Sequence, residues 1–281
     1  MKSNSLFKYF GVLLIIGLLG FTSCNNEEPV LPTDNDVSVS VDEAYLEIAF
    51  EEVEDLAITG IIESYSMGGR MEGDGRFTCA TLTKDSVENA VVITIDFGTN
   101  CTGPDGRVRE GIITVSHSGK PWEYGAIFTI TLSNFSIDGI QIEGTRTSTN
   151  KTVSVSAGII HEIVIAGGKV TWPDATFATR EATRTRTWIR SMNNPMNDVV
   201  ELTGSASGTT RDSKTYEMQI QEKLVFKRSC LVNKIFVPAS GIKNITTSRA
   251  SITIDFGDGT CDTLGTITVN GVSRDVDFSK K

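Results

Sequence analysis

Histidine is almost absent from this chain of 281 residues, which contains only His117 and His161. Neither lies near a Gly-x-Ser-x-Gly turn or a zinc-binding motif, so a general base at His161, beside Glu162, is not favoured. No two cysteines have the close spacing of a zinc knuckle. The sequence therefore predicts no catalytic residue, no metal site and no cofactor. Glycoside hydrolysis stays open, because it needs only two carboxylates at a set separation and the chain has 35 acidic residues.

Basic residues are missing from most of the first quarter of the chain. No Lys or Arg occurs between Lys8 and Arg70, whereas residues 25–69 contain twelve Asp or Glu. Residues 70–281 hold 24 basic and 23 acidic residues, so the net charge of −9 arises in one segment. Phosphate binding needs a concentrated cationic surface, and nucleic acid is therefore not an expected partner.

Only one long apolar run is present, from Phe10 to Phe21, and it follows Lys2 and Lys8. It is too short for a permanent membrane span and is typical of a signal-peptide core. The run ends in Phe21-Thr22-Ser23-Cys24 and resembles a bacterial lipoprotein signal, although Phe21 stands where such signals usually carry Leu. The resemblance implies a signal peptide over residues 1–23, acylation of Cys24 and a membrane contact through the lipid anchor. An ordinary secretory peptide, which would leave Cys24 as a free thiol, is the alternative.

The acidic segment divides into two parts. Residues 24–40, with Pro29 and Pro32, predict a flexible tether. From about residue 42 to 65 the periodicity predicts an amphipathic helix, with a break near Gly60. Its carboxylates are expected on a solvated face opposite the apolar stripe, which consists of Leu46, Ala49, Phe50, Val53, Ala57 and Ile61.

After Gly69 the helical period gives way to alternating Thr, Val and Ile with frequent turn residues. The short connections predict a mainly β protein: an antiparallel meander, sandwich or half-barrel with one N-terminal helix, in a single domain over residues 41–281. The predicted strands are 91–95, 112–115, 126–132, 137–142, 153–159, 163–172, 183–190, 199–205, 216–226, 235–237, 251–256 and 266–269.

An internal repeat groups the remaining cysteines. The hexapeptide at residues 93–98 recurs identically at 252–257, within pseudo-repeated ends at 79–116 and 230–270. One cysteine precedes and one follows each copy, which predicts the disulfides Cys79–Cys101 and Cys230–Cys261. Calcium binding at the second copy is not favoured, because the first copy lacks the corresponding second aspartate.

One stretch has the composition of a binding site. An extended strand would place Arg180, Arg184, Arg186, Trp188 and Arg190 on one face. The candidate ligand-binding residues are Trp172, Arg184, Arg186 and Trp188, because guanidinium and indole groups can hold an anionic glycan or a lipid headgroup. The alternative is a solvent-facing surface on which these arginines pair with residues such as Glu143 or Glu201.

The lipoprotein signal, the Asn-Asn-Glu-Glu start after Cys24 and the twin Ile-Thr-Ile-Asp-Phe-Gly motifs resemble uncharacterised lipoproteins of Bacteroidetes. The resemblance implies an outer-membrane location, facing the periplasm or the cell surface, with Glu27 and Glu28 resembling a surface-export signal. It also implies O-glycosylation at Ser86 and Thr263. The expected role is non-catalytic binding or structure, with no prediction of oligomeric state. The alternatives are a lipid carrier with an apolar cavity between helix and sheet, and a glycan-active enzyme with two facing carboxylates.

Overall fold

The computed structural model describes residues 34–66, 75–87, 90–119, 123–154, 158–233 and 235–278. Within them one long helix, α1 (Asp34–Ser66), accompanies a 14-stranded antiparallel sheet, so the prediction of a mainly β protein with an N-terminal helix is confirmed. The predicted signal peptide, Cys24, Glu27 and Glu28 lie outside the described residues. The strands are β1 (Thr81–Val87), β2 (Ala90–Asp96), β3 (Cys101–Thr102), β4 (Val108–His117), β5 (Ile127–Ile137), β6 (Ile140–Asn150), β7 (Ile159–Thr171), β8 (Phe177–Ile189), β9 (Val199–Thr209), β10 (Thr215–Lys227), β11 (Ser240–Thr247), β12 (Ser251–Asp258), β13 (Leu264–Val269) and β14 (Val272–Asp277). Three short helices complete the described elements: η1 (Gly75–Phe77), η3 (Pro195–Asn197) and α2 (Arg228–Leu231).

The sheet is a meander in which each strand pairs with the next along the chain, except that β3 pairs only with β4. Short connections allow no other arrangement, since parallel neighbours need long crossovers. The sheet is open, with β1 and β14 as its two edges. Both edge strands carry charges, Lys84 and Asp85 on β1 and Arg274, Asp275 and Asp277 on β14. Such charges protect an exposed edge from pairing with another chain.

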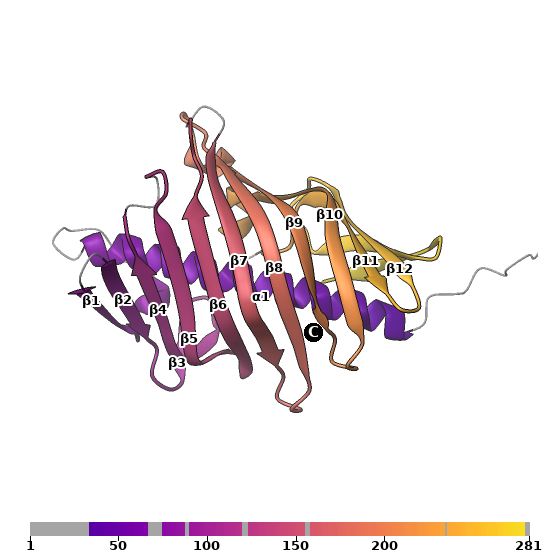
Figure 1. Cartoon of the computed structure of the whole chain (residues 1–281), viewed down its shortest axis with the longest axis horizontal. Helices are drawn as coiled ribbons and strands as arrows, with labels where there is room; N and C mark the ends of the chain where they lie inside the picture. Colours follow the sequence, from indigo (N-terminus) through magenta and orange to yellow (C-terminus); the bar gives the residue numbers. More distant parts are fainter. Residues whose placement is uncertain are drawn as a thin grey trace, which may run out of the picture.

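Helix α1 runs across the strands along the concave side of the sheet and contacts both ends of it, from β1 and β2 to β12 and β13 (Figure 1). Its 33 residues span about 50 Å, enough to cross the whole meander. The predicted apolar stripe is buried against the strands, as expected from its period. The core is a single hydrophobic cluster built from this stripe and from the inward-facing residues of the strands.

Two details of the predicted helix are wrong. The helix begins at Asp34, so part of the predicted tether is helical although Asp, Asn, Ser and Val are weak helix formers. Packing overrides propensity here, because Val39 is buried in the core. The helix also continues through Gly60 without a break, and a Cβ at that position would lie 2.4 Å from the Ile95 side chain. Gly60 therefore allows α1 to approach β2 closely.

Two predicted strands are absent from the described residues, and four strands were missed. In the predicted strand 153–159, residues 155–157 lie outside the described residues, Val153 is exposed and not in a strand, and β7 begins only at Ile159; residues 235–237 lie in the connection to β11 with Val237 buried in the core. The strands β1, β11 and β14 were missed because each carries charged residues inside its run, and β3 was missed because it has only two residues. In β11 the charged residue Lys243 faces the protein interior, where a half-buried strand usually places an apolar side chain.

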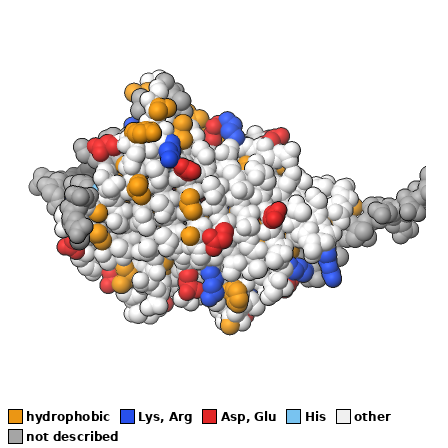
Figure 2. Space-filling model, viewed as in Figure 1, with side chains coloured by type: hydrophobic (Ala, Val, Ile, Leu, Met, Phe, Trp, Pro, Cys, Tyr) orange, Lys and Arg blue, Asp and Glu red, His pale blue; other side chains and the backbone are white. Residues whose placement is uncertain are grey.

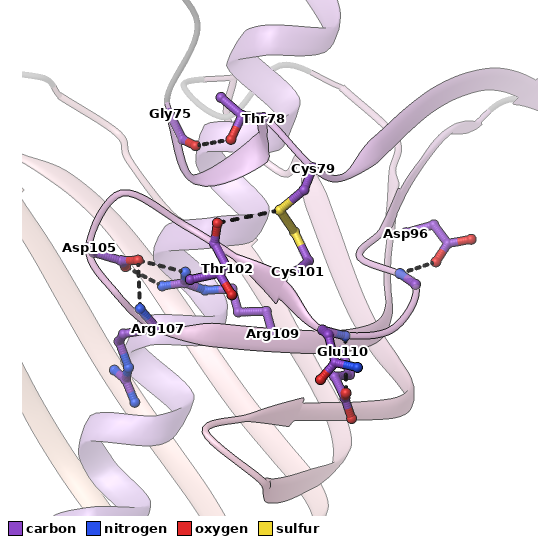
Figure 3. Close-up of a disulfide and its surroundings, with 12 residues drawn as sticks. Gly75, Thr78, Cys79, Asp96, Cys101, Thr102, Asp105, Arg107, Arg109 and Glu110 are labelled. Carbon is purple, nitrogen blue, oxygen red and sulfur yellow. Dashed lines mark hydrogen bonds and ion pairs between the residues drawn. A yellow bond between two sulfur atoms is a disulfide. The ribbon is translucent and has the colours of Figure 1, made fainter.

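Both predicted disulfides are present. Cys79 joins Cys101 with a Cα–Cα distance of 5.5 Å, and Cys230 joins Cys261 at 5.2 Å. The first ties the segment before β1 to β3 (Figure 3), and the second ties α2 to the connection between β12 and β13. Each disulfide therefore stabilises one end of the meander. Strands there are short or have a neighbour on one side only, so fewer hydrogen bonds hold them.

Replacing Cys79 or Cys230 by Ala should lower the free energy of unfolding by about 3 kcal/mol each, because the covalent loop restricts the unfolded chain. Urea unfolding of each variant measures the loss, and peptide mapping without reductant identifies the bonded pairs. Wild-type protein treated with reductant is the control, since it should lose more stability than either variant. A peptide that joins Cys79 to Cys230 or Cys261 would contradict the pairing.

Candidate functional site

Most of the described carboxylates of α1 are buried, although Asp55 is exposed, so the prediction of a solvated acidic face is wrong. Glu43, Glu47, Glu52 and Glu54 are all buried, although they have no cation on their own helix. Their partners are cations on the concave side of the sheet. We call this set the ion-pair seam; it consists of these four glutamates with Arg109, Arg146, Arg180, Arg184 and Lys243, which are also buried.

One half of the seam is centred on Glu47. Its carboxylate accepts hydrogen bonds from Arg180 Nη2 and Arg184 Nη2, both at 2.7 Å. Arg180 Nη1 also donates to Glu43 at 2.7 Å, and Lys243 of β11 forms an ion pair with Glu43. Two turns of α1 are thereby attached to β8 and β11.

The other half lies nearer the C-terminal end of α1. Glu54 forms ion pairs with Arg146 of β6 and, at 3.0 Å, with Arg186 of β8. Glu52 lies 3.2 Å from Arg109 Nη2 and also pairs with Arg107. Arg109 reaches Asp105 as well, with its two terminal nitrogens 3.1 and 2.6 Å from the two carboxylate oxygens (Figure 3).

Burial and neighbouring charges act in opposite directions on the glutamates. Burial alone would raise the pKa of Glu47, but Arg180, Arg184 and Lys243 lower that pKa to about 2. Glu51 is the exception. Burial and the adjacent Glu54 carboxylate raise the pKa of Glu51 to about 7, and its distance of 3.7 Å from Arg146 compensates only in part.

The structure separates the predicted ligand-binding residues into three groups. Arg180, Arg184 and Arg186 do share one face of β8, as predicted, but that face lies under α1 and its guanidinium groups are engaged by the helix glutamates. The alternative of surface pairing is wrong too. Glu143 pairs with Lys169 at 3.0 Å and Glu201 pairs with Lys223 at 2.7 Å.

The two tryptophans lie near opposite ends of β8. Trp172 packs against Tyr45, with ring centroids 5.4 Å apart, and the Arg211 guanidinium lies 4.6 Å from its ring. Trp188 donates from Nε1 to Asp198 at 3.1 Å and lies beneath Arg190. At about 3.3 Å per residue the strand places the two indoles roughly 35 Å apart, so they cannot contact one small ligand together.

The convex side of the sheet carries long rows of hydroxyl and amide side chains, which single-strand patterns did not reveal because each row crosses many strands. One row consists of Thr83, Thr94, Thr114, Thr131 and Thr145. A second crosses eleven strands, from β4 to β14, and only Val164 interrupts its polar side chains; it consists of Ser116, Thr129, Thr147, Val164, Thr183, Ser205, Gln219, Asn244, Thr253, Thr268 and Ser273. We call these two sets the hydroxyl rows.

The convex face carries both paired and single charges, the latter including the exposed Glu181, Glu217 and Glu222. Its ion pairs include Lys151–Glu162 at 3.2 Å, beside those of Glu143 and Glu201. Figure 2 shows this face as mostly neither charged nor hydrophobic, with acidic and basic side chains in scattered groups. Hydroxyl and amide groups donate and accept hydrogen bonds without carrying charge, and strand geometry repeats them at about 4.8 Å across strands and about 6.7 Å along them.

Comparison of the chain with protein-family models, with curated proteins and with solved structures found no match. The described part of the chain contains no cluster of three or more His, Cys, Asp or Glu arranged to hold a metal ion. Among the described helices, none has an apolar stretch long enough to cross a membrane. A functional proposal therefore rests on the sequence, the fold and the surfaces of this protein.

Replacing Glu47 by Gln should lower the free energy of unfolding by about 3–5 kcal/mol, because Arg180 and Arg184 would remain buried without their shared carboxylate. Urea unfolding measures the change. Glu201→Gln is the matched control: its pair with Lys223 lies on the convex surface and should contribute less than about 1 kcal/mol. Equal losses in the two variants would show that the seam does not hold α1 in place.

The Glu51→Gln variant should be more stable than the wild type at pH 8 and nearly equal to it at pH 4.5. Since the pKa of Glu51 is about 7 in the folded protein against 4.5 for an ordinary Glu, folding favours the protonated carboxyl, and this group lowers wild-type stability as the pH rises from 4.5 through 7. Glutamine removes that charge, with an expected gain on the order of 1–3 kcal/mol at pH 8. Urea unfolding at both pH values measures it. A gain of equal size at both values would contradict the assignment.

Proposed function

We propose that this protein is a lipid-anchored, non-catalytic glycan-binding protein of the outer membrane, and that it binds a neutral polysaccharide on its convex face. The hydroxyl rows carry this proposal, because they form an extended surface of uncharged donors and acceptors across most of the sheet. The location rests on the lipoprotein-type signal that ends at Cys24 and on the paired cysteines expected of an exported protein.

A polysaccharide suits this surface better than a small ligand. Single hydroxyl contacts exchange water for another hydrogen-bonding partner, so each contributes little net free energy. A chain that lies along a row makes many such contacts, and its later contacts form at high effective concentration. The sheet curves around α1, which a flexible polymer can follow and a flat crystalline surface cannot (Figure 1).

The arrangement of the interior supports binding outside rather than inside the sheet. A lipid carrier would need an apolar cavity between helix and sheet. That space holds the side chains of Leu46, Phe50 and Val53, packed in the core, together with the ion-pair seam. The concave side is therefore occupied by the protein's own helix.

The double variant Thr147→Glu/Thr183→Glu tests the convex face, because two larger, strongly hydrated carboxylates in the second row would obstruct the row and would have to lose water before a neutral glycan could lie on it. We expect affinity electrophoresis in gels containing dextran, mannan or arabinoxylan to retard the wild type in at least one polymer. The variant should lose at least tenfold in affinity for that polymer.

Thr99→Glu, a substitution at an exposed loop position outside the rows, is the matched control and should bind like the wild type. Thermal unfolding establishes that all three proteins are folded. Wild-type migration unchanged in every neutral polymer, or equal retardation of the wild type and the double variant, would contradict the proposal.

A further inference from the structure

Three neighbouring loops at one end of the strands expose large apolar side chains. They connect β4 to β5 (residues 118–126), β6 to β7 (151–158) and β8 to β9 (190–198), and we call their described residues the loop rim. Met192 is 92% exposed, Val153 is 88% exposed and Tyr124 is 69% exposed. What distinguishes these side chains is their gathering on three neighbouring loops, because single exposed apolar side chains are common on protein surfaces.

The three loops lie side by side. Gly125 N donates to Asn150 O at 2.8 Å, which joins the first loop to the start of the second. Ile159 pairs with Trp188 where β7 begins and β8 ends, which places the second loop beside the third. In Figure 2 hydrophobic side chains gather on the raised part of the molecule at the top of the view, above β7 and β8 in Figure 1.

The opposite ends of the same strands differ sharply in chemistry. The turns there carry mainly charged residues: Asp105, Arg107, Asp138, Asp174, Arg211 and Asp212. Several of them pair with one another, such as Arg107 with Asp138 at 3.0 Å and Arg211 with Asp174 at 2.6 Å. The described loops of strands β4 to β9 thus expose apolar tips at one end, whereas the turns at the other end are rich in charge.

Basic side chains accompany the apolar tips. Lys151 and Arg190 are exposed on the rim, whereas its described acidic residues are Glu123, which is exposed, and Asp198, which is buried and bonded to Trp188 and Ser191. Lys151 is paired with the exposed Glu162 of β7 at 3.2 Å, and the Arg190 guanidinium lies over the Trp188 ring. Apolar tips, a tyrosine and flanking cations are the combination found where proteins enter the interface of an anionic bilayer.

We propose that the loop rim inserts into the interfacial region of the membrane as a second contact beside the lipid anchor. This inference rests on the anchor in the proposed function. The tips protrude from three separate loops, so a deformable lipid surface can accommodate them one by one. Each methylene that the rim buries would add about 0.8 kcal/mol to the attachment that the lipid anchor supplies. The strands would then stand upright on the bilayer, with the convex face exposed to the side.

The test places a fluorescent probe on the anchored, full-length protein in vesicles of phosphatidylethanolamine and phosphatidylglycerol. Met192→Cys and Val153→Cys are each labelled with a nitrobenzoxadiazole thiol reagent, and Phe177→Cys, at the charged end and 46% exposed, is the matched control. The other described cysteines are disulfide-bonded and do not react without reductant. Lipids with a doxyl quencher near the headgroup should reduce emission at positions 192 and 153 at least twofold and leave position 177 unchanged.

Equal and weak quenching at all three positions would overturn the proposal. A blue shift at position 192 in cell envelopes, without lipid quenching in vesicles, would also overturn it, since the rim would then contact a protein. Labelling of the wild-type protein at Cys24 would contradict the anchor and not the rim. In that case vesicle sedimentation of the unanchored protein, with Met192→Glu against Phe177→Glu, tests the rim alone: the rim predicts that only Met192→Glu reduces binding.

Discussion

The structure depends on the match between the carboxylates of α1 and the cations beneath it. A helix that turns glutamates toward a protein core is unstable there unless every charge has a partner, because removing an ion from water costs several kcal/mol. Glu43, Glu47 and Glu54 each contact at least one buried cation of the sheet. These contacts come from β6, β8 and β11, so they fix both the rotation and the position of α1 along the sheet.

This match also explains the uneven charge of the sequence. The inward glutamates of the acidic segment do not serve solubility. They are neutralised by arginines that lie 55 to 137 positions later along the chain, such as Arg180, 133 positions after Glu47. The cost of burying both signs limits how much stability the seam adds over an apolar contact. The seam also restricts the rotation of α1, because a helix turned about its axis would withdraw Glu43 and Glu47 from Arg180 and Lys243.

The features that could be predicted from sequence are those with a local period. Alternation identified most strands, the three- and four-residue steps identified the apolar stripe of α1, and the repeated hexapeptide identified both disulfides. The face shared by Arg180, Arg184 and Arg186 was predicted too, since it follows from the two-residue period of a strand. What covers that face depends on which distant segment packs on it, and no local pattern encodes this. The sequence did contain a signal for this contact. Glutamates recur at helical spacing on the side of α1 that packs on the sheet, namely Glu43, Glu47, Glu51 and Glu54. The hydroxyl rows escaped prediction for a related reason, because register between strands determines them.

The position of the ion-pair seam determines which surfaces remain available for binding. With α1 and its ion pairs filling the concave side, a ligand can reach only the convex face, the rims and the edges of the sheet. The edges carry charges that oppose strand addition, as at Lys84 and Arg274. The two rims differ in polarity, and the convex face is uncharged over most of its area. A protein attached by its apolar rim would keep α1 roughly parallel to the membrane, since the helix runs across the strands (Figure 1). The hydroxyl rows would then run parallel to the membrane as well, and a polysaccharide that lies along the cell surface could follow a row without bending toward the bilayer.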